Sequence, residues 1–313
     1  MMTSNRLCII TWVYGQKYQG WIPLYIYSIK KNYPEYDIKI LTEKKLSLNI
    51  ERLINKYNLA SQAEIIKFED KCIEYCHNNI EKRCLRWLVN FEELSEKYEY
   101  IYIGDIDIYI CGEVPSLLEQ HKNNMLKLRN RTYSNVVRLS VKDYIKNKKK
   151  MDKSLLFRLT GLHFTKTEQY FKNVKRNQEI IKKYLKGKRN KIIDKLFFND
   201  DERCLWLVNL FNGEKYPKGS YQLSDKVFRP YHGVHFAIGR ELNIYNKMRE
   251  ESNIKDMHKY FLKFVDDYNA DETLRALIWD SPFYILRQIS NVCVFWESEF
   301  SKNEIRDSKS FLQ

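Results

Sequence analysis

Two aspartates, Asp105 and Asp107, stand near the end of YEYIYIGDIDIYI (98–110), an apolar run with the composition of a buried strand. Aspartate is depleted in strands, and a buried carboxylate is costly unless it is paired or bound to a metal ion. The i, i+2 spacing of the pair places both side chains on one face of an extended backbone. The run therefore indicates a functional carboxylate pair, although a bare D-x-D pair also occurs by chance at solvated strand ends.

A third ligand is available downstream, because RPYHGVHFAIGR (229–240) holds His232 and His235 next to glycine. Two carboxylates, an imidazole and phosphate oxygens together suit a hard or borderline divalent cation, with Mn²⁺ or Mg²⁺ the natural choices. Such an ion would neutralise a diphosphate and stabilise it as a leaving group. A second acidic group, Asp200 to Glu202, stands where an apolar helix is predicted and where the helix dipole favours negative charge.

The elements that must position these residues alternate along the first half of the chain. Strands are predicted at 6–15, 36–43, 63–70 and 98–110, and helices at 21–34, 48–59 and 73–96. This alternation is typical of βαβ units and predicts an α/β domain with a mostly parallel central sheet flanked by helices. Ligands of open parallel sheets bind at the carboxyl ends of the strands, which is where the carboxylate pair falls.

The second half is predicted to be more helical, with a helix at 167–187, an apolar helix within 192–211 that has the acid cluster 200–202 at its head, and further helices from about residue 246. No linker rich in Gly, Pro or Ser interrupts the chain. We therefore expect a single catalytic domain, residues 1–245, with a helical C-terminal extension, residues 246–313, packed on it. Trp87 and Trp206 lie on apolar helical faces and are expected in the core, whereas His77 and His121 are expected on the solvent side or as helix-capping residues.

Composition places limits on the kind of protein. The chain has 313 residues, 44% of them hydrophobic, and a formal net charge of +14. Lysine runs at 146–153 and 182–191 carry much of the excess charge without the interleaved aromatics of a base-stacking surface, so no nucleic acid partner is expected. They indicate a solvated surface or contact with anionic lipid or polyanions. The apolar start shows no cleavage site and no run reaches membrane-spanning length, so a cytoplasmic location is expected, with peripheral contact on the inner membrane face as a further option.

The seven cysteines are odd in number and irregular in spacing, which does not indicate a disulfide framework. The cluster CIEYCHNNIEKRC (72–84) offers sulfur and imidazole ligands, but no second ligand pair follows at the spacing of a zinc finger. A structural zinc site is therefore not expected.

Four segments between Leu7 and Arg240 resemble, in the expected order, the GT-A-fold nucleotide-sugar glycosyltransferases. The similarity is greatest to the retaining family 8 type, which includes glycogenin and bacterial lipopolysaccharide galactosyl- and glucosyltransferases. The resembling segments are IITWVYGQKYQGWIPLYIYSIKKNYP (9–34), RCLRWLV (83–89) with YIYIGDIDIYI (100–110), FNDDERCLW (198–206) and VHFAIGR (234–240). The resemblance implies a metal-dependent transferase that uses a nucleoside-diphosphate sugar, with UDP favoured, and a polysaccharide, lipopolysaccharide or lipid-linked glycan acceptor.

The resemblance also implies roles for individual residues. Asp105 and Asp107 would hold the metal ion and the ribose-diphosphate, with His235 as the third protein ligand. For the nucleotide, it implies that Arg86 meets the phosphates and that Tyr14 lies against the base. Asp200 or Asp201 is implied to contact the donor sugar. If the reaction inverts the anomeric centre, one of Asp200, Asp201 or Glu202 would be the general base.

The chain departs from the family pattern at two places. The closing motif of the family continues into K-P-W, whereas ELN follows here, so Arg240 is the candidate substitute for the phosphate-binding lysine. The glycine spacing in the same motif leaves His232 as an alternative to His235. RLTGLHF (158–164) occupies the place of the N-A-G acceptor segment and shares only its glycine, which makes Gly161 and His163 candidates for substrate contact.

Two rival functions remain open from the sequence. Nucleotidyltransferases also use a D-x-D pair on a strand, to hold two metal ions, but their upstream Gly-Ser pair is absent from NFEELSEKYEY (90–100). A non-catalytic protein that binds RNA or another polyanion would instead depend on the positive charge, and its binding would fall steeply with salt.

Overall fold

The computed structural model describes residues 7–68, 71–76, 78–88, 94–135, 137–138, 145–146, 156–172, 174–185, 200–211, 213–214, 232–236, 255–282 and 286. Within these ranges the strands are β1 (Leu7–Val13), β2 (Asp37–Thr42), β3 (Glu64–Lys67), β4 (Tyr100–Gly104), β5 (Ile108–Ile110), β6 (His163–Lys166) and β7 (Gly233–His235). The α-helices are α1 (Ile22–Asn32), α2 (Leu48–Lys56), α3 (Asn79–Cys84), α4 (Leu94–Lys97), α5 (Leu117–Leu128), α7 (Thr167–Lys172), α8 (Val174–Leu185), α10 (Asp201–Phe211), α12 (Lys255–Ala270) and α13 (Glu272–Asp280). Three short 3-10 helices complete the set: η1 (Gln16–Trp21), η2 (Lys71–Tyr75) and η3 (Leu85–Leu88).

The central sheet has the strand order β3-β2-β1-β4-β6. β3, β2, β1 and β4 pair in parallel, and only β6 runs antiparallel, against β4. This arrangement confirms the predicted α/β fold with a mostly parallel sheet. It also sends β1 and β4 toward the same edge, where the candidate carboxylates follow.

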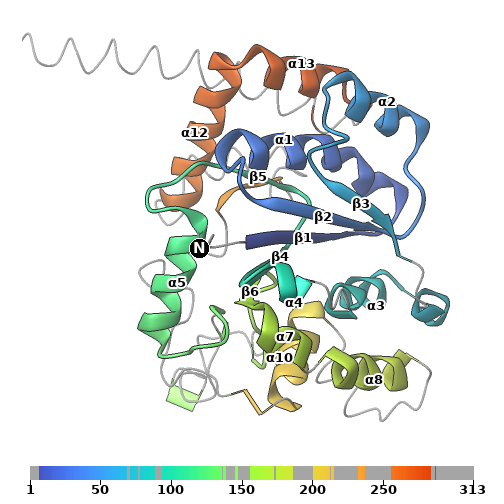
Figure 1. Ribbon diagram of the computed structural model, residues 1–313, viewed down its shortest axis with the longest axis vertical. Coiled ribbons are helices and arrows are strands. Elements are labelled where there is room, and N and C mark those ends of the chain that lie inside the picture. Colours follow the sequence, from blue (N-terminus) through green and yellow to red (C-terminus); the bar gives the residue numbers. More distant parts are fainter. Residues whose placement is uncertain are drawn as a thin grey trace, which may run out of the picture.

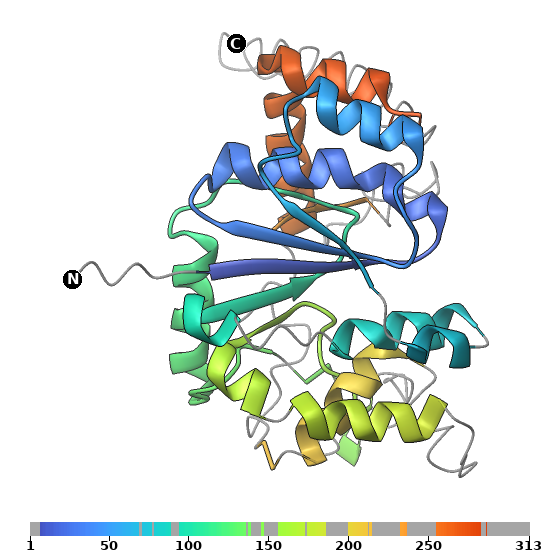
Figure 2. The same cartoon turned by 45° about the vertical axis from the view of Figure 1, so that its right-hand side comes forward.

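Helices cover both faces of this sheet (Figures 1 and 2), with α1, α2, α12 and α13 on one side and α3, α7, α8 and α10 on the other. All residues of β1 are buried, and their side chains alternate between the two layers. Leu7 and Ile9 belong to the apolar core under the first set of helices, and Cys8 and Ile10 to the core under the second set. The continuous apolar sequence of β1 follows from this double coverage, because neither face meets water.

A second, two-stranded sheet pairs β5 with β7 in antiparallel orientation. β5 packs on α1 and β7 packs on α12. This small sheet corrects one prediction, because 98–110 does not form a single strand. β4 ends at Gly104, and β5 starts at Ile108 in the other sheet. The carboxylate pair occupies the connection between the two strands.

The predicted long helix over 73–96 is also wrong. In its place the described residues form η2, α3, η3 and α4, all of them short. The break places Leu85, Arg86 and Trp87 in a buried 3-10 turn beside the sheet. A continuous helix would have rotated Arg86 relative to its observed position, because the 3-10 turn has fewer residues per turn.

The remaining helix predictions are met in part. α7 and α8 occupy the range predicted as one helix, and α10 carries Asp201 and Glu202 in its first turn, as expected for an acidic helix start. α12 and α13 are helices of the C-terminal region, and the proposed boundary near residue 245 falls outside the described residues. Among the described helices, none is both long and apolar enough to cross a bilayer.

Candidate functional site

A cavity of about 280 Å³ lies where β1 and β4 end. Its walls combine aromatic, basic and acidic side chains from segments far apart in sequence: Trp12, Tyr14, Tyr18, Arg83, Arg86, Asp105, Ile106, Asp107, Arg158, Gly161, Asp200, Asp201, Glu202 and His235. The carboxyl edge of the parallel sheet thus forms one wall of the cavity, and most of the described candidate residues line this cavity. This is where ligands bind in open α/β sheets.

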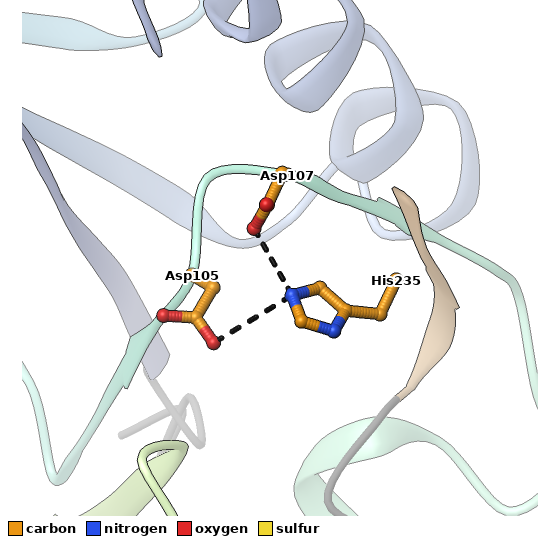
Figure 3. Close-up of side chains that lie close together, drawn as sticks. All are labelled: Asp105, Asp107 and His235. Carbon is orange, nitrogen blue, oxygen red and sulfur yellow. Dashed lines mark hydrogen bonds and ion pairs between the residues drawn. The ribbon is translucent and has the colours of Figure 1, made fainter. Parts of the chain in front are cut away.

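Asp105, Asp107 and His235 come together at one side of the cavity (Figure 3). His235 Nε2 lies 3.1 Å from Asp107 Oδ1 and 4.0 Å from Asp105 Oδ2. The pairing of β5 with β7 creates this contact, because Ile108 is opposite His235 and the Phe236 amide donates a hydrogen bond of 2.8 Å to the Asp107 carbonyl. Two carboxylates and an imidazole nitrogen form a donor set that fits Mn²⁺ or Mg²⁺.

His232, the alternative ligand, lies elsewhere. Its ring is 1% exposed, and its Nε2 lies 2.8 Å from His121 Nε2. The other ring nitrogen, Nδ1, lies 3.2 Å from Glu113 Oε2. The structure therefore groups His235, and not His232, with the two aspartates. His121, expected on the solvent side or as a helix-capping residue, is fully buried, because α5 turns it onto the sheet.

Arg86 joins the metal-ligand group to the second acidic group. Its guanidinium is buried, with Nη1 at 2.8 Å from Asp105 Oδ1 and Nη2 at 3.3 Å from Asp201 Oδ2. Burial by itself would lower the pKa of Arg86, but Asp201 and Asp105 outweigh burial and raise it. Among the described residues, none accepts a hydrogen bond from the buried Nε of Arg86. Arg86 is therefore a permanent cation held at the base of the cavity.

Asp200 and Asp201 have opposite electrostatic environments although they are neighbours in sequence. Burial, and then the charge of Asp201, raise the pKa of Asp200 to about 6. Burial also acts to raise the pKa of Asp201, but the charge of Arg86 outweighs it and lowers that pKa. One carboxylate is thus fixed as an anion, while its neighbour can exchange a proton near neutral pH.

Glu202 is fully engaged by basic partners. Arg138 donates to both of its oxygens, at 2.7 and 2.6 Å, and Arg158 lies 3.0 Å away. The Gly161 amide donates a further hydrogen bond of 3.0 Å to Glu202 Oε1. Arg158 also pairs with Asp200. Glu202 thereby fixes the loop that carries Gly161.

An aromatic wall formed by Trp12, Tyr14 and Tyr18 faces these charges across the cavity. The rings of Tyr14 and Tyr18 have centroids 5.1 Å apart, tilted by 35°. Burial, followed by the proximity of Tyr18, raises the pKa of Tyr14 to about 12, so its hydroxyl stays neutral. Flat, neutral rings at a cavity wall suit a planar ligand such as a nucleobase.

The two remaining candidates on the acceptor side, Gly161 and His163, lie in different surroundings. Gly161 lines the cavity, whereas His163 does not. His163 is buried against Asn135, with Nδ1 at 2.6 Å from Asn135 Oδ1, and burial lowers its pKa to about 3. It belongs to a much smaller, separate pocket with Trp87 and Tyr133. Trp87 is 1% exposed, as expected for a core residue, Trp206 is half-buried, and Arg240 and His77 fall outside the described residues.

The sequence reasoning missed several cavity residues. Trp12, Tyr18, Arg83 and Arg158 line the cavity and lie within the segments compared with the family, but no role was predicted for them; Arg138 acts through Glu202. Arg83 stands three residues before Arg86, so helical spacing would have placed the two on one face. The local sequence around Arg138 and Arg158 does not single them out, because what distinguishes both is a contact with Glu202, more than 40 positions away.

Comparisons with known proteins complete the description of the site. No known family model matches the chain. No curated protein matches it. Among solved structures, the galactosyltransferase LgtC, crystallised with donor and acceptor sugar analogs, is 12% identical with a TM-score of 0.39, over 66% of this chain and 71% of that chain.

Two further solved structures have similar values. The glycosyltransferase GlyE of Streptococcus pneumoniae TIGR4 is 11% identical with a TM-score of 0.40, over 81% of this chain and 53% of that chain. The mannosyltransferase Ktr4p of S. cerevisiae in complex with GDP is 9% identical with a TM-score of 0.38, over 66% of each chain. These neighbours are glycosyltransferases, and likeness at this level does not by itself establish a family for the chain.

Proposed function

We propose that the protein is a metal-dependent glycosyltransferase that moves a sugar from a nucleoside-diphosphate donor to a glycan acceptor. The observation that carries the proposal is the grouping of Asp105, Asp107 and His235 beside the buried cation of Arg86, at the carboxyl edge of a parallel sheet. A diphosphate needs this combination, because a divalent ion and a guanidinium together balance its charge. The resemblance in sequence supports the same reading and favours a UDP-sugar as the donor.

The described residues divide the work of binding. Asp105, Asp107 and His235 would hold Mn²⁺ or Mg²⁺, which supplies charge neutralisation for the departing diphosphate. Arg86 is oriented by Asp105 and Asp201, so it can donate to a phosphate oxygen without losing its place. The ring of Tyr14 would lie against the base.

The acidic group would act at the sugar. Asp201 is fixed as an anion by Arg86 and can accept hydrogen bonds from sugar hydroxyls. If the reaction inverts the anomeric centre, Asp200 is the residue best suited to take the proton from the acceptor hydroxyl, because its pKa of about 6 lies near neutral pH. If the reaction retains the configuration, as the resemblance implies, no such base is required. Product stereochemistry determined by NMR distinguishes the two routes.

The experiment that tests the proposal is thermal unfolding in the presence of UDP, GDP, CDP or CMP, each with and without Mn²⁺. A ligand that binds only the native state stabilises it by RT ln(1 + [L]/Kd), about 2.7 kcal/mol at a hundredfold excess over Kd. We expect a metal-dependent rise in Tm with one nucleoside diphosphate, and loss of this rise in Asp107→Asn.

The absence of any shift would contradict the proposal and favour a polyanion-binding protein. The same measurement is repeated with nucleoside triphosphates; a shift with these alone, together with release of pyrophosphate, would favour a two-metal nucleotidyltransferase instead.

For the acceptor, we propose a polysaccharide, lipopolysaccharide or lipid-linked glycan, reached at an anionic membrane surface by a peripheral contact. The net charge of +14 supports this contact, because basic surfaces gather at anionic lipid. Sedimentation with vesicles that contain phosphatidylserine, at low and at high salt, tests it. Equal recovery with neutral and anionic vesicles at low salt would exclude the membrane contact.

A further inference from the structure

We propose that a buried chain of side chains, Tyr260–Glu113–His232–His121–Ser134, anchors β7 and thereby positions the metal ligand His235. We call these five residues the histidine chain. The inference rests on the proposed metal site. None of the five residues lines the cavity that holds Asp105, Asp107 and His235, so the role assigned to them is positioning and not catalysis.

β7 needs such an anchor because it is only three residues long and carries a ligand whose position must be set closely. Its pairing with β5 fixes the register, and the side chain that follows His235 fixes one end. Phe236 is fully buried, stacked on Trp21 with centroids 5.4 Å apart and in edge contact with Phe264 at 5.2 Å. The other end of β7 is held by His232, which precedes Gly233.

The contacts of His232 run in two directions. Its Nδ1 lies 3.2 Å from Glu113 Oε2, and Glu113 also accepts a hydrogen bond from the Tyr260 hydroxyl of α12. Its Nε2 lies 2.8 Å from His121 Nε2 on α5, and His121 Nδ1 lies 3.1 Å from Ser134 Oγ. The backbone carbonyl of His232 accepts from the Cys111 amide at 2.9 Å, next to β5.

These partners assign the protons when both rings are neutral. Glu113 can only accept while it is ionised, so His232 carries its proton on Nδ1 and accepts at Nε2. His121 must then donate from Nε2, which leaves its Nδ1 to accept from the Ser134 hydroxyl. Every polar atom in the line has a complementary partner, so the chain runs in one direction from Ser134 to Glu113.

The surroundings favour the neutral state that this assignment needs. His121 is fully buried and stacks on Phe164, with centroids 4.4 Å apart and the planes within 3° of parallel. Burial, followed by the proximity of His232, lowers the pKa of His121 well below its ordinary value. The ring of His121 is thus a neutral donor that an apolar ring of similar shape cannot replace.

The chain links three separate elements to β7. Tyr260 lies on α12, His121 on α5 and Glu113 directly after β5. Removal of the His121 ring nitrogen deprives the buried His232 Nε2 of its donor at the entrance to β7, and removal of the Tyr260 hydroxyl deprives Glu113 of one donor. Both changes favour local opening of β7. Loss of partners that orient metal ligands commonly weakens metal affinity about 10- to 100-fold. We therefore expect the histidine chain to control metal affinity from outside the ligand set.

The test uses His121→Phe and Tyr260→Phe, with Tyr98→Phe as the matched control. Tyr98, like Tyr260, donates its hydroxyl to a carboxylate, that of Asp37, but it lies ahead of β4 at the amino end of the sheet. The Kd for Mn²⁺ alone is measured from the EPR signal of free Mn²⁺, and the visible absorption of bound Co²⁺ reports the ligand geometry. Hydrogen exchange of peptides from 105–113 and 232–236 reports the opening of the small sheet.

We expect His121→Phe and Tyr260→Phe to raise the Mn²⁺ Kd at least about tenfold, to change the Co²⁺ spectrum and to speed exchange in the β5–β7 peptides. Tyr98→Phe is expected to leave all three readouts unchanged while lowering Tm to a similar extent as Tyr260→Phe. Equal Mn²⁺ affinity in all four proteins would overturn the inference and leave the proposed function standing. Absence of Mn²⁺ binding in the unsubstituted protein would overturn the proposed metal site and the inference together.

Discussion

Among single residues, Arg86 joins the two acidic groups of the site, because it pairs with Asp105 from one group and with Asp201 from the other. The pair with Asp201 is buried, whereas Asp105 is partly exposed. A buried charge that loses its partner is more costly than the pair is stabilising. Arg86 is therefore expected to matter for stability as well as for binding.

Replacement of Arg86 by Gln tests the buried pair. We expect Arg86→Gln to lower the free energy of unfolding by about 3 kcal/mol at pH 7, since it strands the buried Asp201 carboxylate. Arg86 holds the pKa of Asp201 below its ordinary value in the native state, so this stabilisation is present above that value and is lost as the pH falls through the lowered native pKa. Urea unfolding at several pH values from 7 downward measures it.

Arg86→Lys is the control for charge, because it keeps the cation and loses the planar fork. We expect the free energy of unfolding of Arg86→Lys to lie between the values for the unsubstituted protein and Arg86→Gln. If the loss of stability in Arg86→Gln stays constant down to the lowest pH, the loss does not arise from the Asp201 carboxylate.

Asp200 provides a second prediction, with the opposite sign. Burial raises its pKa from 3.8 in the unfolded chain to about 6, so the native state binds the proton more tightly and the native carboxylate is penalised as the pH rises through this window. Asp200→Asn removes the titration. We expect its stability relative to the unsubstituted protein to improve by about 2 kcal/mol between pH 4.5 and pH 7.5.

Urea unfolding of both proteins at the two pH values measures this difference. Asp266→Asn, at a carboxylate on α12 outside the cavity, serves as the control. A pH-independent difference for Asp200→Asn would show that Arg158 offsets the burial of Asp200 completely.

At the scale of elements, the site depends on where strands stop. β4 leaves the central sheet at Gly104, and the connection to β5 carries both aspartates before the chain enters the second sheet. A continuous strand would have kept the pair in extended backbone. The turn after β1 has a corresponding role, because it sets the aromatic wall.

Gly15, between Tyr14 and Tyr18 of that wall, has a backbone conformation, φ 72° and ψ 150°, that only glycine adopts readily. Its amide donates a hydrogen bond of 2.8 Å to Glu43, which fixes the turn behind Tyr14. No atom lies within 4 Å of a Cβ built at Gly15, so a substitution there meets backbone strain and no clash.

We therefore expect Gly15→Ala to lower the free energy of unfolding by about 1–2 kcal/mol and to weaken nucleotide binding by displacing Tyr14. Chemical unfolding and a nucleotide titration measure the two effects. Gly213→Ala is the matched control, since Gly213 has φ 75°, an equally open surrounding and no contact with the cavity. Equal nucleotide affinity in Gly15→Ala and Gly213→Ala would show that the turn at Gly15 does not contribute to nucleotide binding.

At the scale of the whole molecule, the C-terminal helices α12 and α13 are part of the layer that covers the sheet (Figure 1). Carboxylates on this region pair with side chains of the first half of the chain. Asp271 accepts from Tyr27 at 2.7 Å and from Lys31 at 2.8 Å, while its other oxygen caps α13 through the Leu274 amide. The packing of the C-terminal helices against α1 and the start of α13 thus both depend on Asp271.

Replacement of Asp271 separates the two roles. We expect Asp271→Ala to lower the free energy of unfolding by about 2 kcal/mol, because it removes the cap and the contacts with α1 together. Asp271→Asn keeps a good capping side chain and loses the ion pair, so a smaller loss is expected. Urea unfolding measures both, and equal losses in the two variants would contradict the capping role.

Several features could be predicted from the sequence because they are recorded in local pattern. The alternation of apolar strands and amphipathic helices predicted the α/β fold, and the central sheet confirms it. The carboxylate pair was identified because aspartate in an apolar strand context is unusual, and the group with His235 agrees with that interpretation. The acid start of α10 was identified through the helix dipole.

Other features are absent from any local pattern. The choice of His235 over His232 depends on which of the two histidines meets Asp107, and this follows from the pairing of β7 with β5. The partners of Glu202, Arg138 and Arg158, are recognisable only after the chain has folded. The burial of His121 depends on the face that α5 turns toward the sheet.

By itself, the sequence determined the residue types that can do chemistry and the elements that carry them, because hydrophobic period and turn residues act over a few positions along the chain. Only the tertiary structure decided which of these residues meet. Contacts such as Asp107 with His235 and Arg86 with Asp201 join positions more than 100 residues apart. Such contacts form because strand pairing and core packing bring distant segments together, and no local propensity encodes that distance.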